Sequence, residues 1–132
     1  MRSVVAVGYG GPEVIEIVDR PAPVAGPRDV VISVRAAGLN PLDVKIRDGK
    51  LKTLLKYRFP LVLGNDLSGV VSDVGAHVTR FKKGDAIYAR LDKDRIGTFA
   101  EFAVVREGAA ALADDADLPL SLRARCGISR DR

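Results

Sequence analysis

Apolar residues recur along this chain in short runs separated by glycine, proline and charged residues. The first two runs, Val4–Val7 and Val14–Val18, flank a glycine-rich turn and predict a β-hairpin. Val30–Ala37 alternates in polarity and predicts a half-buried strand. Further strands are predicted over Leu61–Leu63, Leu67–Val74, Ala86–Ala89 and Thr98–Val105. This succession of short strands predicts a mainly β fold, a small barrel or sandwich with one or two short helices.

One helix is predicted directly after Gly38-Leu39. Asn40 is a good N-cap, Pro41 suits the first helical position, and Asp43 stands three residues after the cap. Gly49 is a plausible C-terminal stop. The stretch from Lys50 to Phe59 is expected to be an irregular, basic connection.

The polar pair Asn65–Asp66 interrupts the apolar residues that run from Leu61 to Val74. A buried amide or carboxylate without a partner costs about 1–3 kcal/mol, so the pair needs an explanation. One explanation is a turn between two strands, because Asn and Asp tolerate turn conformations and bond their own main chain. The other is that both side chains face a cavity where another group meets them.

Composition narrows the class of protein. The chain has 132 residues, enough for one domain, and Cys126 and His77 are its only cysteine and histidine. A disulfide framework and a thiolate metal cage are therefore excluded, and no metal site is expected. No apolar run is long enough to span a membrane, which makes the cytoplasm the expected location.

Charge is unevenly distributed along the chain. The net charge is +4, and residues 121–132 hold four arginines against one aspartate. A basic cluster follows the predicted helix start and consists of Lys45, Arg47, Lys50, Lys52, Lys56 and Arg58. It is interpreted as a solvated rim, with an anion-facing role as the alternative. Residues 1–113 are expected to form the domain, and residues 114–132 a flexible or non-native tail.

No nucleotide-binding glycine fingerprint is present, because the glycine-rich stretch at residues 8–12 leads into a strand and not into a helix. Two other stretches resemble a known family. GLNPLD at Gly38–Asp43 and LGNDLSGVV at Leu63–Val71, with Val74-Gly75, Val78, Phe81 and Gly84-Asp85, are similar to the N-terminal domain of the medium-chain dehydrogenase/reductase superfamily. More narrowly, they are similar to its zinc-free quinone oxidoreductase and alkenal reductase branch. The resemblance covers about residues 3–113 and implies a GroES-like, partly open β-barrel without the Rossmann domain.

The resemblance also matches individual residues of this chain to functional positions of the zinc-dependent members. Asn40 falls where zinc-dependent members place a metal-binding cysteine, Asn65 where they place a metal-binding histidine, and Asp66 where they place an acidic residue. Leu42 replaces the hydroxyl residue of their proton relay. The cysteine-rich lobe that binds structural zinc has no counterpart. These departures imply an enzyme that works without zinc.

The implied activity is NADPH-dependent reduction of quinones or α,β-unsaturated carbonyls by hydride transfer. Asn40, Asp43 and Asn65 are the implied catalytic residues: Asn40 donates a hydrogen bond, Asp43 orients it, and Asn65 lines the opposite wall. Asn40, Pro41 and Lys45 are the implied contacts to the cofactor. Helix capping alone would also explain Asn40 and Asp43.

The implied partners are a small quinone or enone, the missing cofactor-binding domain and a second copy in a homodimer, with no nucleic acid and no membrane. The chain is expected to be a truncated or frameshifted product, or a deliberate domain fragment, and to be inactive alone. The alternative is a free-standing GroES-like binding or adaptor module without catalysis.

Overall fold

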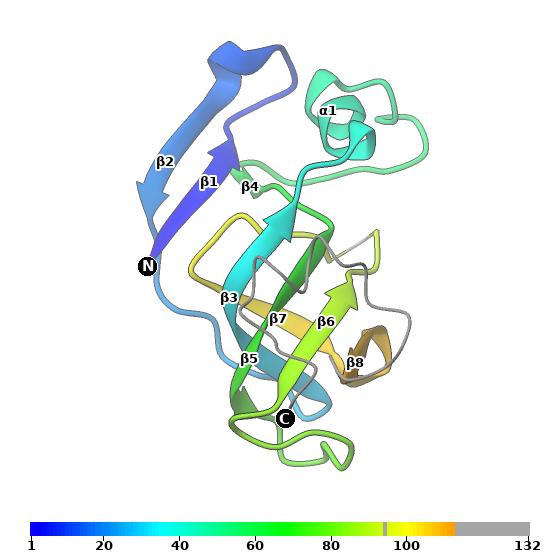
Figure 1. Ribbon diagram of the computed structural model, residues 1–132. Coiled ribbons are helices and arrows are strands. Elements are labelled where there is room, and N and C mark those ends of the chain that lie inside the picture. Colours follow the sequence, from blue (N-terminus) through cyan, green and yellow to red (C-terminus); the bar gives the residue numbers. More distant parts are fainter. Residues whose placement is uncertain (94, 113–132) are drawn as a thin grey trace.

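The computed structural model describes residues 1–93 and 95–112, and the tail predicted over 114–132 lies outside them. Within the described ranges the chain forms two β-sheets and one α-helix, and Figure 1 shows that the helix lies at one end of the molecule. The strands are β1 (Arg2–Ala6), β2 (Ile15–Asp19), β3 (Asp29–Gly38), β4 (Leu61–Val62), β5 (Asp66–Val74), β6 (Ala86–Arg90), β7 (Phe102–Arg106) and β8 (Ala110–Leu112). The helix α1 spans Pro41–Asp48, and short 3-10 turns span Pro12–Val14 and Glu107–Ala109.

The smaller sheet has the order β2-β1-β4, and all its strands pair antiparallel. The predicted hairpin is confirmed, because Val4 pairs with Ile17 and Ala6 with Ile15. The larger sheet has the order β7-β3-β5-β6-β8 and is also antiparallel. Over the described ranges both sheets are open and neither closes into a barrel, which agrees with the partly open barrel that the resemblance implied.

Two apolar clusters form the core. The larger one lies on the five-stranded sheet and includes Val30, Ile32, Leu67, Val71, Ile87 and Val105, each at most 2% exposed. The second cluster centres on Ala6, Ile46 and Leu63 and joins α1 to the smaller sheet. Burial of such side chains stabilises the fold by about 1.5–3 kcal/mol each. No helix in these ranges is long and apolar enough to cross a bilayer.

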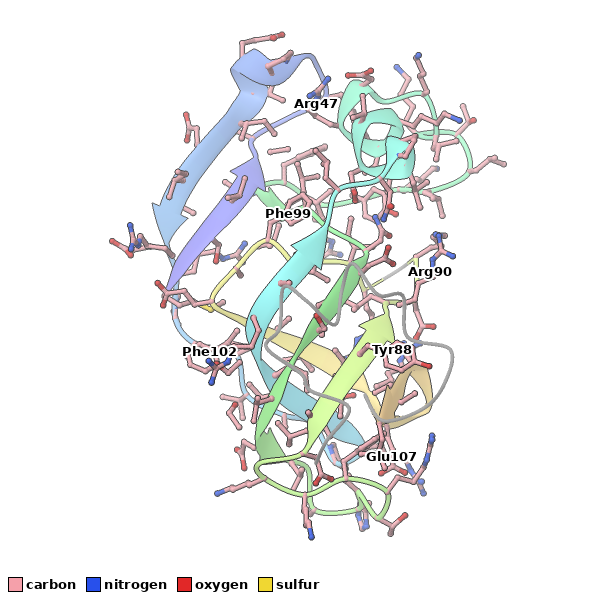
Figure 2. The ribbon with its side chains drawn as sticks, viewed as in Figure 1. Arg47, Tyr88, Arg90, Phe99, Phe102 and Glu107 are labelled. Atoms are coloured by element: carbon pink, nitrogen blue, oxygen red, sulfur yellow. The ribbon has the colours of Figure 1, made fainter. Side chains whose placement is uncertain are left out.

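The helix matches its prediction at both ends. Asn40 and Asp43 form a capping box, Pro41 is the first helical residue, and Gly49 ends the helix in the left-handed conformation with φ 83°. Arg47 turns back toward the hairpin, where its Nε donates to the Gly10 carbonyl at 3.2 Å. Figure 2 shows Arg47 between α1 and the β1–β2 connection.

The prediction for the last strands was partly wrong. β7 begins at Phe102 and not at Thr98, because the segment before it bonds elsewhere: the N–H of Phe99 donates to the Leu63 carbonyl at 2.9 Å. That bond draws residues 97–99 toward the connection between β4 and β5. The short strand β8 was not predicted, and it exists because β6 offers it an edge.

Gly64 lies where residues 97–99 pass the connection between β4 and β5, and a side chain added there would show how closely the two segments pack. It has φ +109°, and an added Cβ would lie 2.1 Å from Thr98 Oγ1 and 3.0 Å from the Phe99 nitrogen. Gly84 has a similar φ of +93° but open space around it. We expect Gly64→Ala to lower the free energy of unfolding by about 3 kcal/mol or more, and Gly84→Ala by about 1 kcal/mol, because only the first adds a clash to the strain. Urea denaturation of the two variants measures the difference, and equal losses would contradict the crowding.

The ion pair of Asp29 and Arg95 makes acid stability depend on one carboxylate. Arg95 Nη1 and Nη2 donate to the two Asp29 oxygens at 3.1 and 3.0 Å, and this hydrogen bonding lowers the pKa of Asp29, against a smaller opposing effect of burial. A pKa that is lower in the folded chain stabilises the fold above the unfolded pKa of about 3.9, and the gain is lost as pH falls through the folded value.

We therefore expect Asp29→Asn to destabilise the chain at neutral pH and to flatten the loss of stability below about pH 5. Asp73→Asn is the control, because Asp73 faces Lys83 at 3.9 Å in an exposed pair that contributes little. Urea midpoints measured across pH give the comparison. If Asp29→Asn loses stability below about pH 5 as steeply as the unaltered chain does, the Asp29–Arg95 pair is not the cause of that loss.

Candidate functional site

Four polar side chains meet where α1 begins beside β5. Asn40 and Asp43 belong to the first turn of α1, which directly follows β3, while Asn65 and Asp66 stand at the start of β5. The two strands are neighbours in the larger sheet, and Gly38 at the end of β3 pairs with Asp66. The sheet register therefore brings the helix start and the Asn65–Asp66 pair together.

Asp43 is the centre of this network and is only 3% exposed. Its Oδ2 accepts a hydrogen bond from the backbone N–H of Asn40 at 2.8 Å, and its Oδ1 accepts one from Asn65 Nδ2 at 2.6 Å. Asn65 is completely buried. Each of the two interpretations of the Asn65–Asp66 pair holds in part: Asn65 lies in the bend between β4 and β5, and its side chain meets a group from α1, whereas Asp66 is already part of β5.

Asn40 extends the network toward the surface. Its Nδ2 donates to Asp66 Oδ2 at 2.5 Å, and Asp66 Oδ1 faces the Nε of Arg90 at 3.6 Å. The Arg90 side chain is 70% exposed, and Figure 2 shows it at the end of β6. A carboxamide nitrogen carries two hydrogens, and Asp66 takes one from Asn40. No acceptor for the other is present within residues 1–93 and 95–112.

Two oxygens in the network have no hydrogen-bond donor in the part of the chain that the structure describes: Asn65 Oδ1 and Asp66 Oδ1. Leaving a buried acceptor unpaired costs about 1–3 kcal/mol. A helix cap needs only Asn40 and Asp43, so it does not account for a buried asparagine whose oxygen is unsatisfied. Such unsatisfied groups in a folded chain call for an explanation, and function is one of them.

The structure brings the three expected catalytic residues into one chain of hydrogen bonds. The other two expected cofactor contacts, Pro41 and Lys45, are exposed on α1 beside it. Sequence reasoning singled out Asp66 as one of the polar pair but gave it no catalytic role, and it missed Arg90. Their pairing follows from the register between β5 and β6, where Asp66 lies opposite Arg90, and no sequence pattern reveals that register.

A small cavity lies on the other side of Asp43, between α1 and the smaller sheet. Its volume is about 190 Å³, and its lining is mainly apolar: Val4, Ile15, Leu39, Val44, Leu63 and Phe99, with Asp43 and Arg47. A larger hollow of about 710 Å³ surrounds Asp29 and Arg95. Four of its charged groups form the ion pairs Asp29–Arg95 and Asp92–Arg106, so the Asn40 network remains the better candidate for chemistry.

Metal-binding residues do not gather in the described ranges, where no three His, Cys, Asp or Glu side chains lie close enough to share an ion. The acidic groups near α1 are instead engaged by amide hydrogens: Asp43 by Asn65 and Asp66 by Asn40. The network is thus built from carboxamides and carboxylates joined by hydrogen bonds, with Asn65 Oδ1 and Asp66 Oδ1 left without a donor in the described ranges.

Comparison with known proteins places this architecture in a family. The model of the alcohol dehydrogenase GroES-like domain matches residues 26–115. A chloroplastic quinone-oxidoreductase homologue of Spinacia oleracea is 37% identical over 108 residues, which is 81% of this chain and 33% of that protein. The mitochondrial NAD(P)H oxidoreductase RTN4IP1 of Bos taurus is 41% identical over 91 residues, 60% of this chain and 23% of that protein.

Solved structures agree on the fold. The quinone oxidoreductase of Pseudomonas syringae pv. Tomato DC3000 superposes with a TM-score of 0.80 at 32% identity, over 93% of this chain and 36% of that one. The chain thus spans about a third of the length of such relatives. With the family model matching most of its length, this chain belongs to the family of alcohol dehydrogenase GroES-like domains, in the medium-chain dehydrogenase/reductase superfamily.

Proposed function

We propose that this chain is the substrate-binding, catalytic domain of an NADPH-dependent oxidoreductase that reduces quinones or α,β-unsaturated carbonyls without zinc. The observation that carries the proposal is the hydrogen-bonded Asn40, which keeps one amide hydrogen available at the start of α1. The names of the similar proteins, quinone oxidoreductase and NAD(P)H oxidoreductase, support the same class of reaction.

Asn40 is the residue that contacts the substrate in this proposal. Reduction of a quinone or enone builds negative charge on the carbonyl oxygen, and a fixed donor stabilises that charge without having to reorganise. The hydrogen bond from Nδ2 to Asp66 holds the carboxamide, and the hydrogen bond to Asp43 holds its backbone. The remaining N–H is the donor for the substrate oxygen.

Asp43 and Asn65 act through Asn40. Both are buried, at 3% and 0% exposure, so neither reaches a substrate from where it lies. Their mutual hydrogen bond of 2.6 Å ties the first turn of α1 to the entry of β5. They are therefore positioning residues, and the wall facing the substrate belongs to Asn40.

The types of side chain around Asn40 also support a reaction that does not use zinc. Zinc in proteins is bound by thiolates, imidazoles and carboxylates. The neighbouring carboxylates here, Asp43 and Asp66, each accept a short hydrogen bond from a carboxamide. Within residues 1–93 and 95–112 no third carboxylate, thiol or imidazole lies close enough to share an ion with them.

A bound reduced nicotinamide cofactor supplies the hydride. From this chain Asn40, Pro41 and Lys45 would contact it. Pro41 and Lys45 are exposed, and the Lys45 ammonium has no partner elsewhere in residues 1–93 and 95–112, which suits an anionic ligand. The rest of the cofactor site belongs to a separate domain. A homodimer and a cytoplasmic location stay predictions, while the curated relatives above are named chloroplastic and mitochondrial.

Activity is tested in a chimera in which this chain replaces the matching 36% of the Pseudomonas syringae quinone oxidoreductase. We expect the chimera to oxidise NADPH in the presence of a benzoquinone, faster than NADH, and the 132-residue chain alone to be inactive. Asn40→Ala should lower kcat by about 10²–10³-fold, the usual effect of removing a donor to a developing oxyanion. Lys82→Ala, an exposed change in the connection between β5 and β6, is the control.

Equal turnover of the chimera with and without Asn40→Ala would remove Asn40 from the mechanism. An inactive chimera that folds normally would favour a binding or adaptor module over an enzyme. Saturable NADPH oxidation by the 132-residue chain alone would contradict the need for a separate cofactor domain.

The positioning role is tested by exchanging two partners. Asp43→Asn places two amide groups against each other and should cost about 2–3 kcal/mol of unfolding free energy. The double variant Asp43→Asn with Asn65→Asp restores a carboxylate opposite a carboxamide and should recover a large part of that loss. Urea denaturation of the three proteins measures the coupling. Additive losses in the double variant would contradict the direct contact.

A further inference from the structure

The segment that joins α1 to β4, residues 50–59, has an inward and an outward face. Leu51, Tyr57 and Phe59 pack into the second core cluster around Ile46. The Tyr57 hydroxyl donates to the Lys93 carbonyl at 2.7 Å, and the Phe59 ring meets Tyr9 edge-on at 4.8 Å. Residues on this inward face therefore hold the segment against the protein.

The outward face holds Lys50, Lys52, Leu54, Lys56 and Arg58, all of them exposed, with the uncharged Thr53 also exposed between Lys52 and Leu54. Leu54 is 81% exposed and stands in the middle, with two cations before it and two after it. We call these five residues, together with the exposed Lys45 of α1, the basic loop surface. Figure 2 shows nitrogen-tipped side chains extending outward from α1 and the segment that follows it.

Nothing in the described part of the chain neutralises this surface. None of its five cations has an ion pair or side-chain hydrogen bond there. The two acidic residues of the same region are engaged elsewhere, since Asp43 is buried and Asp48 pairs with Arg47 at 2.9 Å. Residues 41–60 hold six cationic and two acidic side chains, whereas the other described residues hold eleven and ten.

We propose that the basic loop surface docks the protein on an anionic lipid bilayer. Cationic side chains near an anionic membrane are attracted to it, and an apolar side chain among them gains by entering the interface. The order of two cations, Leu54 and two cations matches both requirements. Leu54 would insert between headgroups while the lysines and Arg58 remain at the level of the lipid phosphates.

A bilayer fits this surface better than a nucleic acid does. Proteins that bind single strands combine cations with exposed aromatic rings on which bases stack. The aromatic residues here, Tyr57 and Phe59, are turned inward and packed. The exposed side chain is instead aliphatic, and Leu54 gains nothing from a polyphosphate. The sequence analysis expected no membrane partner because no apolar run is long enough to span a bilayer. That argument concerns crossing a membrane and does not apply to docking on its surface.

The position of the surface connects it to the candidate site. Lys45 lies five residues after the N-cap Asn40, about 7.5 Å along the axis of α1 at the helical rise. Docking would thus hold the site near the bilayer, where hydrophobic quinones dissolve. The link between docking and access to membrane quinones rests on the proposed function, whereas docking itself does not.

The proposal is tested by measuring how much of the 132-residue chain co-sediments with lipid vesicles. Vesicles of phosphatidylcholine alone are compared with vesicles that also contain the anionic lipid phosphatidylglycerol. We expect binding to the anionic vesicles alone, weakening with added salt. Replacing Lys50, Lys52 and Lys56 by Gln should lower the partition coefficient about 100-fold, from about fivefold per lysine. The control replaces Lys82, Lys83 and Lys93 by Gln, which removes the same charge from other exposed positions and should change little.

The contribution of the apolar Leu54 to vesicle binding is tested with a variant and a matched control. Leu54→Ser should weaken binding about tenfold, as expected for loss of a buried leucine. Val24→Ser is the control, because Val24 is 87% exposed but lies outside the basic loop surface. The arginines of residues 121–132 are kept in every protein, so differences between variants report on the changed positions.

Three results would overturn the proposal: no binding of the unaltered chain to anionic vesicles, equal losses in the two lysine triples, or equal effects of Leu54→Ser and Val24→Ser. Tighter binding to a single-stranded oligonucleotide than to vesicles, lost in the Lys50, Lys52 and Lys56 triple, would assign the surface to nucleic acid instead. The assay contains neither quinone nor cofactor, so failure of docking and failure of the proposed function remain distinguishable.

Discussion

The arrangement of this domain depends on one buried carboxylate. Asp43 accepts hydrogen bonds from the Asn40 backbone and the Asn65 side chain, at 2.8 and 2.6 Å, and so bonds one helix end to the entry of one strand. A carboxylate buried to this extent is tolerated only where its oxygens are hydrogen-bonded. Because both oxygens are engaged from different elements, Asp43 fixes where α1 sits on the larger sheet. The orientation of Asn40 follows from that.

The network contains more than the helix needs. A cap made of Asn40 and Asp43 satisfies the first turn of α1, yet the chain also buries Asn65 with its Oδ1 unsatisfied, next to a glycine crowded by Thr98. The unsatisfied Oδ1 costs stability, whereas the glycine fits where any side chain would clash. An unsatisfied buried acceptor in a folded chain calls for an explanation, and function is one of them. The combination distinguishes a built site from an ordinary helix start.

Sequence reasoning succeeded where the deciding interactions are local. The helix was predictable because its cap, its first proline and its final glycine all lie within ten residues. It failed or stayed open where a distant partner decides: the Asn65–Asp66 pair was explained as well by a turn until Asp43 was placed beside it. The late start of β7 depends on the bond from Phe99 to Leu63, and the pairing of Asp66 with Arg90 depends on sheet register. Alternation within one strand carries no information about either.

The same helix accounts for the position of the basic loop surface but not for all of its charge. Cations near the C-terminus of a helix are stabilised by its dipole, which explains Lys45 and Lys50 without any ligand. That effect fades within a turn, so it does not reach Lys56 or Arg58. Their outward direction comes from the packing of Tyr57 and Phe59, which leaves the alternate positions in solvent. A leucine at the centre of those positions is neither favoured by the dipole nor needed for solubility, and it is the residue that separates a docking surface from a solvated rim.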